Sequence, residues 1–434
     1  MYFKTLNELI AHCEKNGFYI GFFGNMELFG QKLEINRTQL NNRFAILPME
    51  GNDADEDGRP STLTRRRYLR YAESGAGLIW FEAVAVVREG RASPHQQYLT
   101  AENMETFRSL VRQIKEEGFH KNGFAPCVIA QLTHSGRYSK PDGNPRPVIA
   151  ARNPVLDEKY NIPGDYAPIS DGGLEKLEAD FVSCASLAKE AGFDGVDLKA
   201  SHGYLLCELL SGFTREGKYG GSFDGRTRFL KNIVQKVRQA TSPEFLLASR
   251  ITIWDAQPYP YGFGAEPGGH GPDFSEPIQL IRQLKELGLD LIGPTMGNPY
   301  LNPHINRPFD KGPYEPPEDP LFGAARFLNY TAQIKKAVPE LPVAGAGYSY
   351  LRQFGIEAAA YGLQNGHIDI MGLGRQAFAC PRIISDILEQ KEPDSKKLCI
   401  TCSKCTQIMR NGGQAGCPVR DPEIYLPIYR QYCK

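Results

Sequence analysis

The sequence predicts a (β/α)₈ barrel, in which eight parallel strands alternate with eight helices and close into a ring. The first observation is a regular alternation of strand-like and helix-like runs across residues 41–390. The second is the stretch 192–222, where Lys199, His202 and Tyr204 follow the fourth expected strand, because barrels of this class carry their active site at the carboxyl ends of the strands. The third is a pair of glycine-rich turns after the seventh and eighth expected strands, where such barrels bind phosphate.

Short apolar runs bounded by turn residues mark the strands, and amphipathic runs between them mark the helices. The expected strands cover residues 44–49, 77–86, 126–132, 195–200, 245–251, 289–294, 342–345 and 368–372. The expected helices cover residues 62–74, 105–117, 174–191, 226–240, 277–287, 324–338, 350–363 and 381–390. A doubly wound open sheet is the alternative, but it usually has a glycine-rich turn after its first strand. Here Met49 is followed by EGNDADEDGRP, which has no phosphate-binding pattern.

The chain of 434 residues divides into three expected parts. Residues 1–40 form an N-terminal cap segment, residues 41–390 the catalytic barrel, and residues 391–434 a C-terminal extension that begins with a polar linker. Two connections, 252–276 and 295–323, are rich in Gly, Pro and Tyr and are too long for simple turns. Long loops in compact domains are usually functional, so we expect both loops to lie over the catalytic face.

Composition excludes several classes of partner. Lys and Arg total 50 and balance 50 Asp and Glu, which gives no electrostatic reason to expect binding to nucleic acid or to an acidic membrane. No apolar run reaches the roughly 18–20 residues that a bilayer span needs. The N-terminus lacks the uninterrupted apolar core of a secretory signal, so the sequence predicts a cytoplasmic protein.

Half of the ten cysteines crowd the end of the chain. Cys399, Cys402, Cys405 and Cys417 are separated by two, two and eleven residues, and Cys433 follows as a spare thiol. One dense cysteine cluster in a long cytosolic chain predicts a metal site rather than disulfides. Four thiolates at this spacing can hold Zn²⁺ or an iron–sulfur cluster.

Polar side chains follow several of the expected strands. Gln131 lies at the end of the third strand and Arg250 at the end of the fifth. The glycine-rich turns contain Gly345, Gly347 and Gly374, the last followed by Arg375. Backbone N–H groups in such turns can approach a phosphate and a guanidinium can pair with its charge, so the sequence predicts a phosphate site here. The alternative for the 199–204 stretch is a basic loop in which Lys199 forms a salt bridge to a nearby acid.

The motifs QLTHSGR, HGYLLCELLS, KYGGSFDGRTRFL and MGLGR, in this order and spacing, resemble those of the old yellow enzyme family of FMN-dependent ene-reductases. The resemblance covers residues 42 to 390. The four-cysteine tail is similar to that of the branch containing 2,4-dienoyl-CoA reductase and trimethylamine dehydrogenase, in which a [4Fe–4S] cluster follows the barrel. The resemblance implies cluster ligation by Cys399, Cys402, Cys405 and Cys417.

The resemblance also implies the roles of the barrel residues. Tyr204 falls on the family's proton-donor tyrosine, and Lys199 and His202 on the donor pair that holds the substrate oxygen. Residues implied to contact FMN are Pro48, Met49, Ala83, Gln131, Arg250, Gly345, Gly347, Gly374 and Arg375. Lys199 and Glu50 depart from the residues that many members of the family carry.

The implied reaction is hydride transfer from reduced FMN to the β-carbon of an α,β-unsaturated carbonyl or carboxylate compound, with Tyr204 protonating the α-carbon. The expected partners are a small enone or enoate, NAD(P)H or a separate electron-donor protein, and a second copy of the chain in a homo-oligomer. The chain ends at Lys434, which leaves no room for the C-terminal nucleotide-binding region of the longer relatives. Two alternatives stay open: an amine or alcohol dehydrogenase that exports electrons, and a zinc-pinned barrel without catalysis.

Overall fold

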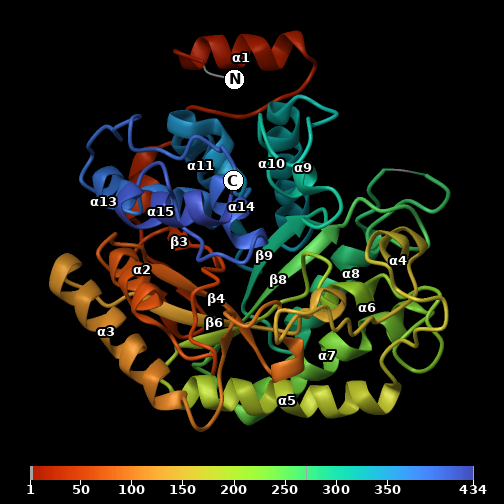
Figure 1. Ribbon diagram of the computed structural model, residues 1–434. Coiled ribbons are helices and arrows are strands. Elements are labelled where there is room, and N and C mark those ends of the chain that lie inside the picture. Colours follow the sequence, from red (N-terminus) through yellow and green to blue (C-terminus); the bar gives the residue numbers. More distant parts are fainter. Residues whose placement is uncertain (1–2, 270, 434) are drawn as a thin grey trace.

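Eight parallel strands form the predicted barrel in a computed structural model that describes residues 3–269 and 271–433 (Figure 1). The hydrogen-bonded order is β10-β11-β3-β4-β6-β7-β8-β9, and a bridge between Ile292 and Val343 brings β9 next to the segment before β10. The strands are β3 (Phe44–Ile46), β4 (Leu78–Ala85), β6 (Cys127–Thr133), β7 (Gly195–Leu198), β8 (Leu246–Trp254), β9 (Leu291–Met296), β10 (Ala344–Gly345) and β11 (Ile370–Leu373). Each corresponds to one expected strand, so the predicted (β/α)₈ fold is confirmed.

Helices surround the barrel and match the expected series (Figure 1). These are α2 (Thr62–Ala72), α3 (Met104–Asn122), α5 (Asp171–Glu190), α7 (Phe223–Ala240), α8 (Ser275–Glu286), α10 (Pro320–Ala337), α11 (Gly355–Gln364) and α13 (Ile383–Leu388). In α7 the Ser222 side chain caps the first turn, and buried Phe229, Ile233 and Val237 face the barrel at helical spacing. The seventh helix starts later than expected, because Arg352 has φ 52° and residues 348–354 form the 3₁₀ helix η4 (Tyr348–Phe354) instead.

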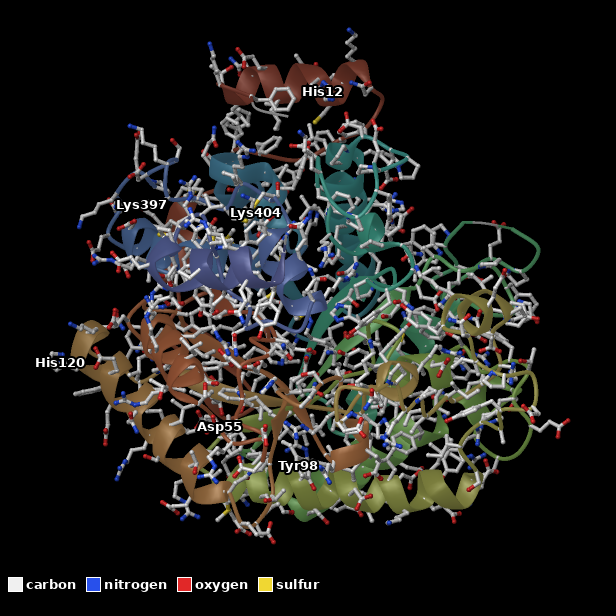
Figure 2. The ribbon with its side chains drawn as sticks, in the orientation of Figure 1. His12, Asp55, Tyr98, His120, Lys397 and Lys404 are labelled. Atoms are coloured by element: carbon white, nitrogen blue, oxygen red, sulfur yellow. The ribbon has the colours of Figure 1, made fainter. Side chains whose placement is uncertain are left out.

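Shorter elements decorate the barrel. They are α1 (Leu6–Lys15), η1 (Met26–Gly30), β1 (Leu33–Ile35), β2 (Thr38–Leu40), η2 (Arg88–Gly90), β5 (Gln97–Tyr98), η3 (Gly136–Tyr138), α4 (Pro154–Lys159), α6 (Leu205–Leu210), α9 (Pro303–Asn306), α12 (Arg375–Ala379), α14 (Lys404–Arg410) and α15 (Pro422–Tyr432). The helix α1 lies apart from the strands at the top of the view, and its His12 bonds Asp319 before α10 at 2.6 Å (Figure 2). Within the described part of the chain, we find no helix with the length and apolarity needed to cross a bilayer.

A buried aspartate joins four strands inside the barrel. The carboxylate of Asp197 on β7 accepts hydrogen bonds from the Trp80 indole at 2.8 Å, the Gln131 amide at 2.5 Å and the Arg250 backbone N–H at 2.7 Å. These donors belong to β4, β6 and β8, the strands around β7. Because a buried carboxylate is tolerated only when it is hydrogen-bonded, this arrangement fixes the relative register of the strand ends that carry the site.

The C-terminal extension packs on the segment that follows β3. The Ala415 N–H donates to the Gly51 carbonyl at 2.6 Å, and the Asn52 amide donates to the Gly413 carbonyl at 3.0 Å. On α2, Arg66 pairs with Asp421 just before α15 at 2.7 Å. The extension is therefore held against the carboxyl ends of the strands, where the predicted site lies.

A buried ion triad of Arg67, Asp53 and Glu82 gives a stability prediction. The Arg67 guanidinium lies 2.8 Å from Asp53 and 2.6 Å from Glu82, and all three side chains are buried. Replacing Arg67 by Met leaves two carboxylates buried side by side, so we expect a loss of about 3–5 kcal/mol in the free energy of unfolding, measured by urea denaturation. The control Arg65→Met changes an exposed arginine of the same helix and should shift stability by no more than about 0.5 kcal/mol. Equal effects of the two substitutions would refute the role of the triad.

Candidate functional site: a cavity at the carboxyl ends of the strands

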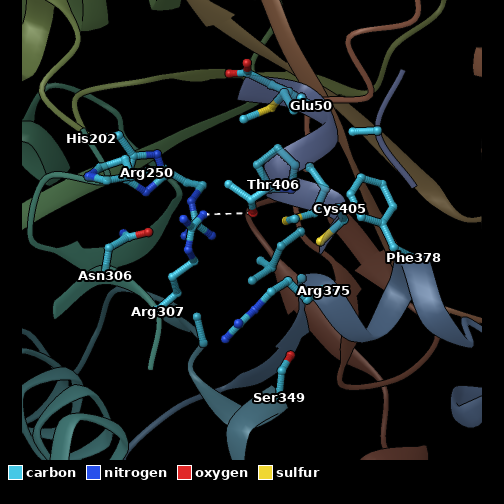
Figure 3. Close-up of a pocket in the computed structure, with 18 of the residues that line it drawn as sticks. Glu50, His202, Arg250, Asn306, Arg307, Ser349, Arg375, Phe378, Cys405 and Thr406 are labelled. Carbon is cyan, nitrogen blue, oxygen red and sulfur yellow. Dashed lines mark hydrogen bonds between the residues drawn. The ribbon is translucent and has the colours of Figure 1, made fainter. Parts of the chain in front are cut away.

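A large cavity opens at the carboxyl ends of the barrel strands (Figure 3). Its empty space, counted out to open solvent, is about 1250 Å³. The segments that follow β3, β7, β10 and β11 line it, together with β8, the loop after β9, and α14 of the C-terminal extension. This is the face at which (β/α)₈ barrels carry their active sites.

Lys199 and Tyr204 share one carboxylate partner on the wall of this cavity. The Lys199 ammonium lies 2.9 Å from an oxygen of Glu50, and the Tyr204 hydroxyl donates to the same oxygen at 3.3 Å. The Lys199 ammonium also lies over the Tyr204 ring, 3.9 Å from its centroid. The Tyr204 hydroxyl is 3.1 Å from that of Tyr300, so four polar side chains form one connected network.

Burial decides the protonation of Tyr204 and His202, which both line the cavity. It raises the pKa of the Tyr204 phenol well above its usual range, and the nearby Glu50 charge raises it further. Burial lowers the pKa of His202 well below its usual range, and the positive charges of Lys199 and Arg250 lower it further. At neutral pH the site therefore holds a protonated phenol and a neutral imidazole.

Tyrosines form one side of the cavity. Tyr300 stacks on Tyr138 with ring centroids 3.8 Å apart, and Tyr160 meets Tyr138 edge to face at 5.2 Å. The Tyr160 hydroxyl donates to the Tyr300 carbonyl at 3.2 Å, and the Asn298 amide donates to the Tyr138 hydroxyl at 2.9 Å. These contacts fix the Tyr300 ring and with it the hydroxyl that meets Tyr204.

Three arginines on the cavity wall have buried guanidinium nitrogens without a hydrogen-bond partner. These atoms are Nη1 of Arg250, Nε and Nη2 of Arg307, and Nη1 of Arg375. Burial lowers the pKa of Arg250 to about 10, and burial with the neighbouring charges of Arg375 and Arg410 lowers that of Arg307 to about 9. Buried cationic donors without acceptors fit an anionic ligand, so the donor set fits the FMN that the sequence motifs imply (Figure 3).

Two predicted glycines approach the cavity where a side chain would not fit without displacement. Gly347 has φ 96°, and a Cβ there would lie 3.3 Å from the Phe327 ring. A Cβ on Gly374 would lie 3.3 Å from the Met49 sulfur. Backbone can therefore come close to a ligand at the ends of β10 and β11, as phosphate binding requires.

Most of the predicted site residues lie together. Those that line the cavity are Pro48, Met49, Lys199, His202, Tyr204, Arg250, Gly347, Gly374 and Arg375. Ala83, Gln131 and Gly345 lie on β4, β6 and β10 and are not among the lining residues. Sequence reasoning missed the roles of Tyr300, Arg307 and Arg410 as wall residues. The available signal was the long 295–323 loop, which contributes the first two.

The four tail cysteines predicted as ligands line one neighbouring cavity of about 340 Å³ of empty space. Cys405, Arg375 and Phe378 line both this cavity and the large one, so they form the wall between the two (Figure 3). Over residues 3–269 and 271–433, no three His, Cys, Asp or Glu side chains converge closely enough to hold a single metal ion. Cys433 lies outside the four-cysteine cavity.

Comparison with known proteins places these features in a family. Residues 27–394 match the family described as NADH:flavin oxidoreductase / NADH oxidase. The chain is 26% identical over 416 residues to a probable N-methylproline demethylase of Rhizobium meliloti, covering 93% of this chain and 56% of that protein. It is 30% identical over 269 residues to an NADPH dehydrogenase of Bacillus subtilis, covering 61% of this chain and 72% of that one.

A solved structure of 2-naphthoyl-CoA reductase shares the fold, with a TM-score of 0.74, 20% identity and coverage of 94% of this chain and 58% of that one. The chain thus spans little more than half the length of this reductase and of the demethylase. Because the family match extends over most of the chain, the assignment does not depend on any single relative. The protein belongs to the NADH:flavin oxidoreductase / NADH oxidase family.

Proposed function

We propose that the protein is an ene-reductase that reduces a C=C bond conjugated to a carbonyl or carboxylate group. The observation that carries this proposal is the buried Tyr204 phenol on the cavity wall, beside the two donors Lys199 and His202. Reduction of an activated alkene needs a hydride at the β-carbon, stabilisation of charge on the carbonyl oxygen, and a proton at the α-carbon. Bound FMN supplies the hydride from its N5 atom.

The chain supplies the other two requirements. The Lys199 ammonium and an N–H of neutral His202 donate hydrogen bonds to the substrate oxygen, where negative charge develops. The Tyr204 hydroxyl gives its proton to the α-carbon, and the Tyr300 hydroxyl at 3.1 Å and the Glu50 carboxylate at 3.3 Å connect it to a source for reprotonation. The hydride, the proton and the two electrons of the opened π bond together account for the saturated product.

We assign the FMN contacts as the family motifs imply. Pro48 and Met49 would contact the flavin ring, Arg250 would donate to its pyrimidine edge, and Gly347, Gly374 and Arg375 would hold the phosphate. The same motifs imply that Ala83 lies near the rim of the ring, that Gln131 donates to its pyrimidine edge and that Gly345 contacts the phosphate, although none of the three is among the lining residues. The unpartnered nitrogens of Arg250 and Arg375 favour it, because each gains an acceptor.

Charge favours an acidic substrate over an amine. The cations on the described cavity wall are Lys199, Arg250, Arg307, Arg375 and Arg410. Glu50 is the one carboxylate among the described lining residues, and Lys199 already pairs with it. An FMN phosphate offsets only part of this excess of positive charge, so an α,β-unsaturated carboxylate or its acyl derivative fits better than an ammonium.

The alternative, amine oxidation, has one observation in its favour. Glu50 stands beside the Tyr204 and Tyr300 rings, and a carboxylate with aromatic faces suits an alkylammonium. A relative named as a probable N-methylproline demethylase agrees with this chemistry.

We expect Glu50→Gln to keep or improve the binding of an enoate, because Lys199 is then free to pair with it. Amine binding would instead weaken about tenfold or more, and equilibrium titration of the oxidised flavin spectrum measures both.

We further propose that Cys399, Cys402, Cys405 and Cys417 bind a [4Fe–4S] cluster. The chain would then consist of a cap of residues 1–40, a catalytic barrel of residues 41–390 and a cluster-binding extension of residues 391–434. The support is that all four cysteines line one cavity. Three closely spaced cysteines followed by a distant fourth are more typical of a cluster than of a zinc ribbon, in which the cysteines come as two C-x2-C pairs. Electrons then come from NAD(P)H or from a donor protein.

Isotope placement tests the ene-reductase proposal. Flavin reduced anaerobically with deuterated NADH should be reoxidised by an enone or enoate from a panel of both classes. Deuterium should appear at the β-carbon, whereas in D₂O with unlabelled reductant it should appear at the α-carbon. The proposal fails if no member of the panel reoxidises the flavin faster than buffer does, or if amines reduce the flavin instead.

A further inference from the structure

The large cavity at the carboxyl ends of the strands is called the flavin cavity from here on. A second cavity adjoins it on the side of the C-terminal extension. It lies between the loop that follows α9 and the helices α14 and α15, and we call it the tail groove. Its empty space, counted out to open solvent, is about 850 Å³. Arg307, Thr406 and Arg410 line both the tail groove and the flavin cavity, so the two spaces meet at these residues. None of the residues described as lining the tail groove is acidic.

The junction between the two spaces carries positive charge that is not neutralised. Arg307 uses Nη1 to donate to the Thr406 hydroxyl at 3.0 Å, while its Nε and Nη2 are buried without partners. Arg410 donates to the Pro299 carbonyl at the exposed rim. Arginine is favoured at phosphate sites in proteins, because its planar guanidinium can donate two parallel hydrogen bonds to phosphate oxygens.

Beyond the arginines the tail groove offers an aromatic face. Tyr429 of α15 lines it, and its hydroxyl donates to the Gln407 side chain at 3.1 Å, which fixes the ring. Lys404 stands over the same ring at 4.9 Å from its centroid, on the helix α14 (Figure 2). Asn411 adds a side-chain amide to the wall. A phosphate ion needs neither the aromatic face nor this volume, whereas a purine nucleotide uses both.

We propose that the tail groove binds the adenosine diphosphate portion of a cosubstrate whose reactive end enters the flavin cavity. The arginines at the junction meet the diphosphate, and Tyr429 meets the adenine. Two cosubstrates have this portion in common: NAD(P)H, whose nicotinamide must reach the flavin, and an acyl-CoA thioester, whose acyl group is the alkene. The inference does not depend on the ene-reductase chemistry, since binding of the nucleotide needs no turnover.

Calorimetric titration of the FMN-loaded protein with ADP is the test. We expect ADP to bind, and we expect Arg410→Gln to weaken its binding about tenfold or more, because a charged hydrogen bond to phosphate is lost. Tyr429→Leu should weaken it by a similar factor through lost stacking. The matched control Arg430→Gln removes the same charge from an exposed position of α15 that does not line the groove, and it should leave ADP binding unchanged.

Competition identifies the source of the nucleotide. Adenosine 2′,5′-bisphosphate represents the NADPH end and adenosine 3′,5′-bisphosphate the CoA end. If the bisphosphates compete with the reductant during flavin reduction, the cosubstrate is a nicotinamide dinucleotide. If they compete instead with an acyl-CoA alkene during reoxidation, it is a thioester. The proposal is overturned if ADP and both bisphosphates fail to bind, or if Arg410→Gln and Arg430→Gln change binding equally. Nucleotide binding without alkene reduction would refute the proposed function alone.

Discussion

Replacing Tyr204 by Phe is expected to leave the reduction of FMN by NAD(P)H intact and to slow its reoxidation by the alkene about 10²–10⁴-fold. The reason is that the phenol is buried, protonated and linked to Tyr300 and Glu50, whereas the substituted ring has no proton to give. Single-turnover kinetics under anaerobic conditions separate the two half-reactions.

A second tyrosine serves as the matched control. Tyr219 is equally buried, but its hydroxyl donates to Glu178 at 2.9 Å, away from the lining of the flavin cavity. Tyr219→Phe should therefore leave both half-reactions unchanged. If Tyr204→Phe also leaves reoxidation unchanged, Tyr204 is not the acid. If it slows both half-reactions alike, its role is to shape the cavity rather than to deliver a proton.

Substitution of Cys402 by Ala is expected to remove most of the iron and acid-labile sulfide while sparing much of the FMN. Cys402 lines the four-cysteine cavity, but unlike Cys405 it does not line the flavin cavity, so loss of the cluster need not open the flavin site directly. Metal and sulfide assays on anaerobically purified protein, with the visible spectrum of the same sample, measure both cofactors.

The control for this substitution is Cys433→Ala. Cys433 belongs to the same extension and lines the tail groove, but it is outside the four-cysteine cavity, so its loss should leave the iron content at the wild-type level. A Cys402→Ala protein with full iron content refutes the ligand assignment. Stoichiometric zinc without sulfide in the wild-type protein refutes the cluster and restores the zinc-pinned alternative.

The sequence predicts the barrel well because its strands are buried on both faces. A run such as Leu78–Ala85, in which every residue is buried, has to be almost wholly apolar and is visible without structural information. Residues that follow such runs must gather at one end of a parallel barrel, which is why Lys199, His202, Tyr204 and Arg250 fall together. Burial on both faces constrains the residues of each strand, and this is visible in the sequence. The parallel order of the strands then brings their carboxyl ends together.

Pairings between segments far apart in the chain could not be predicted in the same way. Lys199 and Glu50 are 149 residues apart, and Tyr204 and Tyr300 are 96 apart. Tyr300 meets Tyr204 because the irregular loop after β9 folds back over the strand ends, and no periodicity records that path. The sequence indicated that Lys199 and Glu50 depart from many family members, yet not that each departure provides the partner of the other.

The short segment after β3 has contacts on every side. Glu50 pairs with Lys199, the Gly51 N–H donates to Glu82 at 2.7 Å and its carbonyl accepts from Ala415, while Asp53 pairs with Arg67. A Cβ on Gly51 would lie 2.1 Å from the Arg67 guanidinium, so alanine would fit there only if the Arg67–Asp53 ion pair moved. In evolutionary terms, this segment can exchange side chains only in coordinated sets and cannot change length, because one inserted residue would misalign the ligand cavity, the ion triad and the docked extension at once.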